Sequence, residues 1–364
     1  MAVICPENGM AMLKRADIIR KACFLSYAVR PFRAEMIAHQ VFGRLKSAIG
    51  PGSGFRIIDL AITGECNLSC RHCSAALLNQ GVETLSLPDY REIVKQGKRL
   101  DNLSWNITGG EPLMVDWLDD LIPVLEPNRH YISLQTNAWL LTSKRAGQLA
   151  ALGVNCITTS LDSAVERLHD GFRGRTGSYR KVFEGIRHAR AAGMRTLVGA
   201  TITHDFLYSS DLIRLIEKVN SAGALFLFNL AVPCGRWRER TDIILTPADR
   251  RRLGRLMDRY PRSSTDHEVG RNRIGCPAGM EKIYITAGGE VLPCPFIQVS
   301  FGNCRSESLA DIVHRMRRVP EFNCYQPICV AAEDRIFQDN VFPKIYGGEQ
   351  SACPISYREI YGCL

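Results

Sequence analysis

An alternation of short strand-like runs with amphipathic segments, over residues 55–231, constrains the fold of this chain more than any other feature. Runs of β-type composition are expected at residues 56–63, 103–108, 131–136, 156–161, 196–203 and 225–231. Helical periodicity is expected at residues 88–100, 117–125, 143–152, 179–192 and 211–222. Strands that alternate with helices of this length predict an α/β fold with a parallel sheet built from βαβ units.

A loop with three cysteines follows the first predicted strand. Its residues 64–73 read GECNLSCRHC, so that Cys66, Cys70 and Cys73 have CxxxCxxC spacing. Three thiolates can hold a [4Fe–4S] cluster by three irons and leave the fourth iron open, whereas four cysteines would saturate it. A zinc site is the alternative, but zinc usually takes four ligands and the fourth is missing locally.

Glycine-rich and polar segments follow the next predicted strands. Residues 108–112 read TGGEP, in which glycines allow close backbone approach to a ligand; the alternative is a plain turn. Asn137 and Asp162 follow the third and fourth strands, where short polar side chains either bind a ligand or cap the next helix. Ser160, at the end of the fourth strand, is interpreted as a ligand-binding residue.

These motifs, in this order and at these strand ends, resemble the radical S-adenosylmethionine (SAM) family. The resemblance implies a partial (βα)6 TIM-like barrel, with SAM on the open iron of a [4Fe–4S] cluster and catalytic chemistry at the three-cysteine loop. It also implies that residues 169–174, HDGFRG, belong to the HD-x-x-RG stretch of a peptide-modifying branch, and that residues 198–201 line the adenine pocket.

The same resemblance implies roles for individual side chains. His72 packs near the adenine, and Glu111 or a nearby carbonyl accepts a hydrogen bond from the SAM amino group. Arg173 pairs with the SAM carboxylate in a charge-assisted contact, with Arg175 as its local rival. The complete set of expected cofactor-binding residues is His72, Thr108, Gly109, Gly110, Glu111, Pro112, Thr136, Asn137, Ser160, Asp162 and Arg173.

A second cysteine-rich region begins at Cys276 and resembles a SPASM or "twitch" extension, with a hairpin at residues 284–292 and a Gly-x4-Cys motif that ends at Cys294. The region lacks the CxxCx5CxxxC run of a full two-cluster SPASM domain. We expect one auxiliary iron–sulfur cluster, held by Cys276, Cys294 and Cys329. Its fourth ligand is Cys324, Cys353, a non-cysteine group or substrate. Zinc is the alternative here, and Cys304 is expected to be a free thiol.

The patterns divide the chain into an N-terminal helical segment at 1–54, the partial barrel at 55–240, a linker helix within 241–275 and the auxiliary cluster domain at 276–364. The N-terminal segment either packs on the barrel, which we favour, or lies on a membrane surface.

Composition restricts location and partners. No apolar stretch approaches the ~18–20 residues of a membrane span, and no signal peptide is recognised, so we expect a cytoplasmic protein whose 14 cysteines serve metal or redox chemistry. The net charge of +9 indicates solvated helix faces, or a docking surface for an acidic electron donor such as flavodoxin or ferredoxin. No nucleic-acid-binding module is recognisable.

The leading functional hypothesis is a radical SAM oxidoreductase that abstracts hydrogen from a peptide or a small natural product, with net oxidation. A redox-neutral radical SAM epimerase or mutase is the alternative among enzymes. A non-catalytic iron–sulfur or zinc scaffold is the alternative outside enzymes, and the apparent SAM pocket argues against it.

Overall fold

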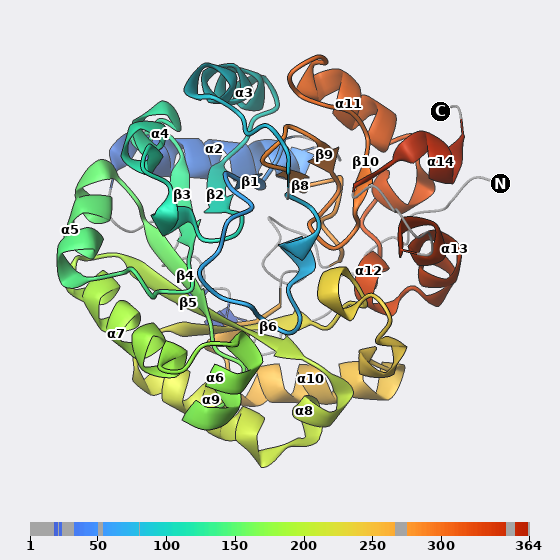
Figure 1. Ribbon diagram of the computed structural model, residues 1–364. Helices are drawn as coiled ribbons and strands as arrows, with labels where there is room; N and C mark the ends of the chain where they lie inside the picture. Colours follow the sequence, from blue (N-terminus) through green and yellow to red (C-terminus); the bar gives the residue numbers. More distant parts are fainter. Residues whose placement is uncertain are drawn as a thin grey trace.

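The computed structural model describes residues 18–20, 22–23, 33–49, 54–79, 81–265, 275–346 and 354–362. All six expected strands are present, namely β1 (Ile57–Ala61), β2 (Ser104–Thr108), β3 (Tyr131–Gln135), β4 (Cys156–Ser160), β5 (Arg195–Ile202) and β6 (Leu225–Leu230). They are parallel and paired in sequence order, so the predicted α/β partial barrel is confirmed. Figure 1 shows the strands curving around a centre with helices outside them.

The helices between the strands cover the outer face of the sheet (Figure 1). They are α3 (Leu87–Arg99), α4 (Leu118–Val124), α5 (Ser143–Leu152), α6 (Glu166–Arg173), α7 (Ser178–Ala191), α8 (His204–Tyr208) and α9 (Ser210–Ser221). Local sequence fixes several of their starts: Ser86 and Asp89 form a capping box on α3, and Thr142 accepts the amide hydrogen bond of Arg145 at the start of α5. Apolar side chains between sheet and helices form the core.

The C-terminal region extends this sheet. Strand β8 (Lys282–Ile285) pairs in parallel with β1, and β9 (Val291–Leu292) forms the predicted hairpin with β8. On the other edge, α10 (Pro247–Arg259) leads to β7 (Ser263–Ser264) beside β6. The remaining elements are β10 (Val299–Ser300), α11 (Leu309–Met316), α12 (Val330–Glu333), α13 (Arg335–Tyr346), β11 (Ile355–Ser356) and α14 (Tyr357–Tyr361). The continuous sheet places the second cysteine region directly beside the first barrel strand.

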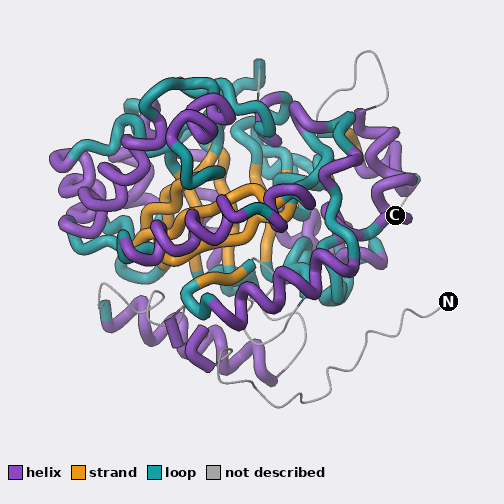
Figure 2. Tube along the Cα trace, turned by 90° about the horizontal axis from the view of Figure 1, so that it is seen from below, coloured by secondary structure: helices purple, strands orange, loops and turns teal. Residues whose placement is uncertain are grey.

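Helix α2 (Ala34–Ile49) packs against the amino-terminal side of the strands, as the favoured alternative predicts. Gln40 Nε2 donates to the Leu103 carbonyl, just before β2, at 2.8 Å, and Arg33 Nη1 donates to the Pro127 carbonyl, before β3, at 2.6 Å. Figure 2 shows α2 at the lower left, beyond one end of the strands. No helix in the described part of the chain is long and apolar enough to cross a membrane.

Candidate functional site

The three-cysteine loop leaves the carboxyl end of β1, and its thiols lie near enough to affect one another's pKa. Burial raises the pKa of the Cys66 thiol, and the negative charges of Glu111, Cys70 and Cys73 raise it further. Burial likewise raises the pKa of Cys73, with Cys70 as the next cause. Among the described residues, no three His, Cys, Asp or Glu side chains are grouped closely enough to hold one metal ion. A [4Fe–4S] cluster binds each thiolate through a different iron and therefore tolerates a wider spacing.

Three glycines from other parts of the chain lie against this loop. A side chain at any of these three positions would clash with the loop. A Cβ on Gly110 would lie 2.0 Å from the Glu65 carbonyl oxygen. A Cβ on Gly174 would lie 2.3 Å from Ser69 Oγ, and one on Gly235 would lie 2.3 Å from the Cys73 carbonyl oxygen. Both Gly174 and Gly235 also have positive φ, which other residues rarely adopt. The glycines of the TGGEP and HDGFRG motifs thus shape the cysteine loop itself.

Hydrogen bonds from distant residues hold the loop in place. The amides of Gly110 and Glu111 donate to the carbonyls of Thr63 and Glu65 at 2.8 and 2.7 Å. Arg236 Nη1 donates to the Cys70 carbonyl at 3.0 Å, and Gln298 Nε2 donates to the Ser74 carbonyl at 2.7 Å. Sequence reasoning missed Gly235, Arg236 and Gln298, because no local motif marks a residue that contacts a loop so far away in sequence.

Glu111 is fully buried, and its carboxylate is used within the protein. It accepts hydrogen bonds from the Leu113 amide, Thr136 Oγ1 and the Asn137 amide at 3.0, 2.7 and 2.7 Å. Burial raises its pKa, and these donors oppose that shift. Which of the two expected acceptors, Glu111 or a nearby carbonyl, binds the SAM amino group stays a prediction. The hydrogen bond between Thr136 Oγ1 and Glu111 joins the ends of β2 and β3.

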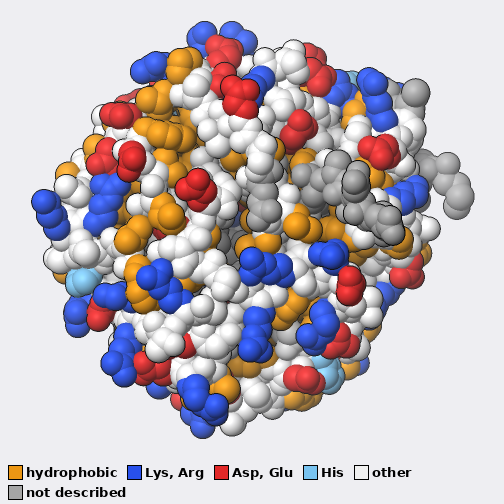
Figure 3. Space-filling model, in the orientation of Figure 1, with side chains coloured by type: hydrophobic (Ala, Val, Ile, Leu, Met, Phe, Trp, Pro, Cys, Tyr) orange, Lys and Arg blue, Asp and Glu red, His pale blue; other side chains and the backbone are white. Residues whose placement is uncertain are grey.

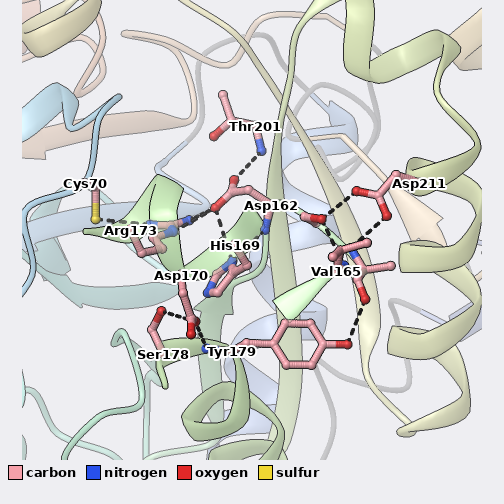
Figure 4. A network of polar contacts seen from close by, with 12 residues as sticks. Cys70, Asp162, Val165, His169, Asp170, Arg173, Ser178, Tyr179, Thr201 and Asp211 are labelled. Carbon is pink, nitrogen blue, oxygen red and sulfur yellow. Dashed lines mark hydrogen bonds and ion pairs between the residues drawn. The ribbon is translucent and has the colours of Figure 1, made fainter. Parts of the chain in front are cut away.

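Arg173 and Asp162 form an ion pair below the cysteine loop, and Figure 4 shows Arg173 between Cys70 and Asp162. Arg173 Nε and Nη2 lie 2.7 and 2.6 Å from Asp162 Oδ2, and Nη1 lies 3.7 Å from Cys70 Sγ. Arg175 Nη1 donates to the Asn67 carbonyl at 2.9 Å, with its guanidinium over the Trp139 ring. Arg173 and Arg175 thus approach the loop from the same helix end.

His72 lies in a group of aromatic side chains. Its ring stacks on Phe172 at 4.6 Å between centroids and lies 5.6 Å from the Trp237 ring. Burial lowers its pKa to about 4, so the ring is neutral. Its Nδ1 is buried with no hydrogen-bond partner among the described residues, which leaves a polar atom for a ligand.

The polar residues after β3 and β4 do not cap the following helices. Asn137 accepts from the Trp139 amide and donates to Asn67 Oδ1 at 2.7 Å, while Thr142 caps α5. Asp162 forms an ion pair with Arg173 and does not cap α6, so the capping alternative is wrong for Asp162 also. Ser160 is half-buried and paired with Gly199 through the sheet, but its hydroxyl makes no hydrogen bond in the described part of the chain. Its hydroxyl is open to a ligand.

The remaining residues that we expect at the cofactor site lie in different environments. Thr108 and Gly109 are half-buried at the end of β2, and Thr108 Oγ1 donates to Gln135 Oε1 at 3.4 Å. Pro112 is buried at the start of a 3-10 turn, Pro112–Met114, away from open space. Within residues 198–201, Val198 and Ala200 belong to the apolar core under α7 and α9, so the adenine-pocket expectation is wrong for these two. Alternation along β5 sends their neighbours to the opposite face.

A second group of thiols lies in the C-terminal region. Contact with Cys276 is the first cause that raises the pKa of Cys329, followed by burial and by the charges of Cys276 and Cys294. Burial, then Cys276, raises the pKa of Cys294. The three thiols therefore lie near one another, and their role as ligands of one auxiliary cluster stays a prediction. Glu333 Oε2 accepts the Cys329 amide at 2.8 Å, and its Oε1 binds Arg250 Nε and Nη2 of α10 at 2.7 Å.

Other cysteines of this region differ in environment. Cys324 is buried, and its sulfur lies 3.5 Å from Gln326 Nε2. The backbone carbonyl of Gln326 accepts a hydrogen bond from the Cys276 amide. Cys304 is buried, which raises the pKa of its thiol to about 12. Cys353 lies outside the described residues. Both thiol groups, the glycine-lined loop and the orphaned His72 Nδ1 fit a SAM-bound catalytic cluster and an auxiliary iron–sulfur cluster.

The exposed face over the strand ends carries basic side chains. Arg71, Arg236 and Arg238 are exposed in or next to the cysteine loop. Figure 3 shows Lys and Arg side chains just below the hollow at the middle of this face.

Comparison with known proteins agrees with this geometry. The profile of the radical SAM superfamily matches residues 60–218, and that of the SPASM iron–sulfur cluster-binding domain matches residues 276–331. The chain belongs to the radical SAM superfamily, in its SPASM branch. SAM, a [4Fe–4S] cluster and auxiliary iron–sulfur binding are properties of these two domains.

Relatives in this family carry out different reactions. The chain is 24% identical over 298 residues to the AdoMet-dependent heme synthase of Nitratidesulfovibrio vulgaris. The matched region covers 73% of this chain and 81% of the heme synthase. It is 26% identical to the subtilosin biosynthesis protein AlbA of Bacillus subtilis, over 74% of this chain and 63% of AlbA. The structure of Streptococcus suis SuiB bound to precursor peptide SuiA has a TM-score of 0.60 and 19% identity, over 78% of this chain and 68% of SuiB. The likeness to SuiB shows the fold.

Proposed function

We propose that this radical SAM enzyme is an oxidoreductase that removes hydrogen from a peptide or small natural-product substrate with net oxidation. The observation that supports this most is the second group of thiols: Cys276 and Cys294 flank the β8–β9 hairpin that continues the barrel sheet, and Cys329 lies near them at the start of α12. A second cluster beside the barrel supplies an acceptor for the electron that net oxidation must remove.

In this proposal Cys66, Cys70 and Cys73 hold the catalytic cluster. When bound and reduced, the cluster and SAM supply a 5′-deoxyadenosyl radical that takes a hydrogen atom from substrate. The protein positions these groups: Gly110, Gly174 and the other glycines hold the loop close to the strand ends. His72 and Ser160 offer an aromatic face and a free hydroxyl to SAM.

Substrate class rests on the relatives. AlbA and the sporulation killing factor maturation protein SkfB support a peptide, as does SuiB, whose structure holds a precursor peptide. The heme synthases support a small molecule. The exposed arginines at the cysteine loop favour docking of an acidic donor, flavodoxin or ferredoxin, close to the cluster that it reduces.

The test begins with anaerobic reconstitution of the parent and of two triple Cys→Ala variants, one for each thiol group. We expect about eight irons per chain in the parent and about four in each variant. Only the parent and the auxiliary variant should produce 5′-deoxyadenosine from SAM and dithionite. About four irons in the parent, all lost with Cys66, Cys70 and Cys73, would remove the auxiliary cluster and the case for net oxidation.

Product mass then separates the two enzyme alternatives. Candidate substrates are precursor peptides, with reaction in deuterated water. A product with two hydrogens fewer than the substrate supports net oxidation. A product with the same elemental formula, apart from deuterium taken up from the solvent, supports a redox-neutral epimerase. A fully loaded parent that yields no 5′-deoxyadenosine would favour the scaffold.

A further inference from the structure

We propose that Arg173 raises the reduction potential of the catalytic cluster through its contact with Cys70, and that Asp162 is the positioning residue that aims it. The inference rests on the proposed cluster at Cys66, Cys70 and Cys73. It gives Arg173 a role different from the expected pairing with the SAM carboxylate.

The guanidinium has one edge for each neighbour. Its Nε and Nη2 both face Asp162 Oδ2, at 2.7 and 2.6 Å, so Asp162 occupies the Nε/Nη2 edge, one of the edges that can make two-point contacts with carboxylates. Its Nη1 remains, and it lies 3.7 Å from Cys70 Sγ (Figure 4). Two-point pairing of this edge with a SAM carboxylate would require Asp162 to be displaced.

Asp162 is itself held from several sides. Its side chain is only 4% exposed, and its Oδ1 accepts the Thr201 amide from β5 at 3.1 Å. The amide of Asp162 donates to His169 Nδ1 at 3.1 Å, on the helix that carries Arg173. Burial lowers the pKa of His169 to about 4, so its ring remains a neutral acceptor. The direction of the Arg173 guanidinium is therefore set by β4, β5 and α6 together.

The expected effect follows from charge. Net charge and hydrogen bonds to the cysteine sulfurs are among the quantities that set cluster potentials. The reduced cluster has one more negative charge than the oxidised cluster, so a fixed cation at a ligand sulfur stabilises the reduced state. The Arg173 side chain is 12% exposed, and water screens its charge little.

Redox titration of the SAM-free, reconstituted protein, followed by EPR, tests this. In Arg173→Gln we expect the reduction equilibrium constant of the catalytic cluster to fall at least tenfold, a shift of 59 mV for one electron. The auxiliary triple Cys→Ala background isolates the signal. Arg175→Gln is the matched control: it removes the same charge from the same loop but no contact with a thiol, and we expect less than a threefold change.

Arg173→Gln leaves the buried Asp162 carboxylate unpaired, so a second variant guards against misfolding. Arg173→Gln with Asp162→Asn removes both charges, and we expect a smaller shift in the same direction because Arg173 lies between Asp162 and Cys70 (Figure 4). Iron content is counted in each protein, and SAM affinity is measured in parallel.

The inference would be overturned if Arg173 variants with a full catalytic cluster had the same reduction potential as the parent. If these variants also lost SAM affinity, the result would support the expected pairing of Arg173 with the SAM carboxylate. An equal shift in Arg175→Gln would overturn it also, since the contact with Cys70 would then be irrelevant. A parent that assembles no catalytic cluster would overturn the proposed function together with this inference.

Discussion

Gly110→Ala tests whether the TGGEP motif shapes the cysteine loop. The added Cβ would lie 2.0 Å from the Glu65 carbonyl oxygen, 2.5 Å from its carbon and 2.9 Å from the Gly64 carbonyl oxygen. All three are backbone atoms, so no side chain can rotate away. The turn after β2 and the cysteine loop must therefore separate.

Separation breaks the two hydrogen bonds that join them, from the amides of Gly110 and Glu111 to the carbonyls of Thr63 and Glu65. Each contributes about 1 kcal/mol net, and overpacking adds about 1–3 kcal/mol. We therefore expect the free energy of unfolding to fall by about 3–5 kcal/mol. The catalytic cluster should load poorly, because the loop that carries its ligands has moved.

Urea unfolding of the cluster-free protein and iron counts after reconstitution measure the two effects. Gly147→Ala is the control, since a Cβ there meets nothing within 4 Å and the residue is inside α5. It should stabilise the protein by about 0.5–1 kcal/mol. A Gly110→Ala protein with the parent's urea midpoint and iron content would refute the argument.

Three further predictions concern the auxiliary thiols and the histidine beside Asp162. Cys329→Ala should lower iron content by about four per chain, whereas Cys304→Ala, at a buried thiol outside the group, should not. Glu333→Ala removes the acceptor of the Cys329 amide and the partner of Arg250; we expect faster loss of auxiliary iron to a chelator and about 1–2 kcal/mol lower stability in urea. The pKa of His169 is about 4, against about 6.5 when unfolded, so the unfolded chain binds more protons between these values and stability falls as pH drops through them. Between pH 7 and 5, the free energy of unfolding in urea should fall by about 2 kcal/mol less in His169→Asn than in the parent. Equal falls in the two proteins would contradict the lowered pKa of His169.

The sequence was sufficient wherever the signal is local. The periodicity of residues 55–231 predicts six parallel strands, because side-chain alternation and helical repeats are set by neighbours along the chain. The spacing of Cys66, Cys70 and Cys73 predicts one loop that can bring three thiols together. The start of α3 follows from Ser86 and Asp89, whose reciprocal hydrogen bonds span three residues.

Roles that depend on contacts between strand ends required the tertiary structure. Sequence placed Glu111, Asp162 and Arg173 near a ligand, but it did not reveal that Glu111 is buried against Thr136 or that Asp162 directs Arg173 toward Cys70. A short polar residue after a strand has the same local signature whether it faces a ligand, caps a helix or binds another side chain. Its neighbours decide among these.

The sequence by itself determined the family and the strand–helix order, since each is carried by short-range spacing, and the same kind of spacing predicts the cysteines of the two thiol groups. Only the tertiary structure decided that β8 lies beside β1, and that Arg236 and Gln298 hold the cysteine loop. These contacts join residues 166 and 224 positions apart. Their physical basis is the register of the open, curved sheet and the packing of its ends, which no local pattern of residues specifies.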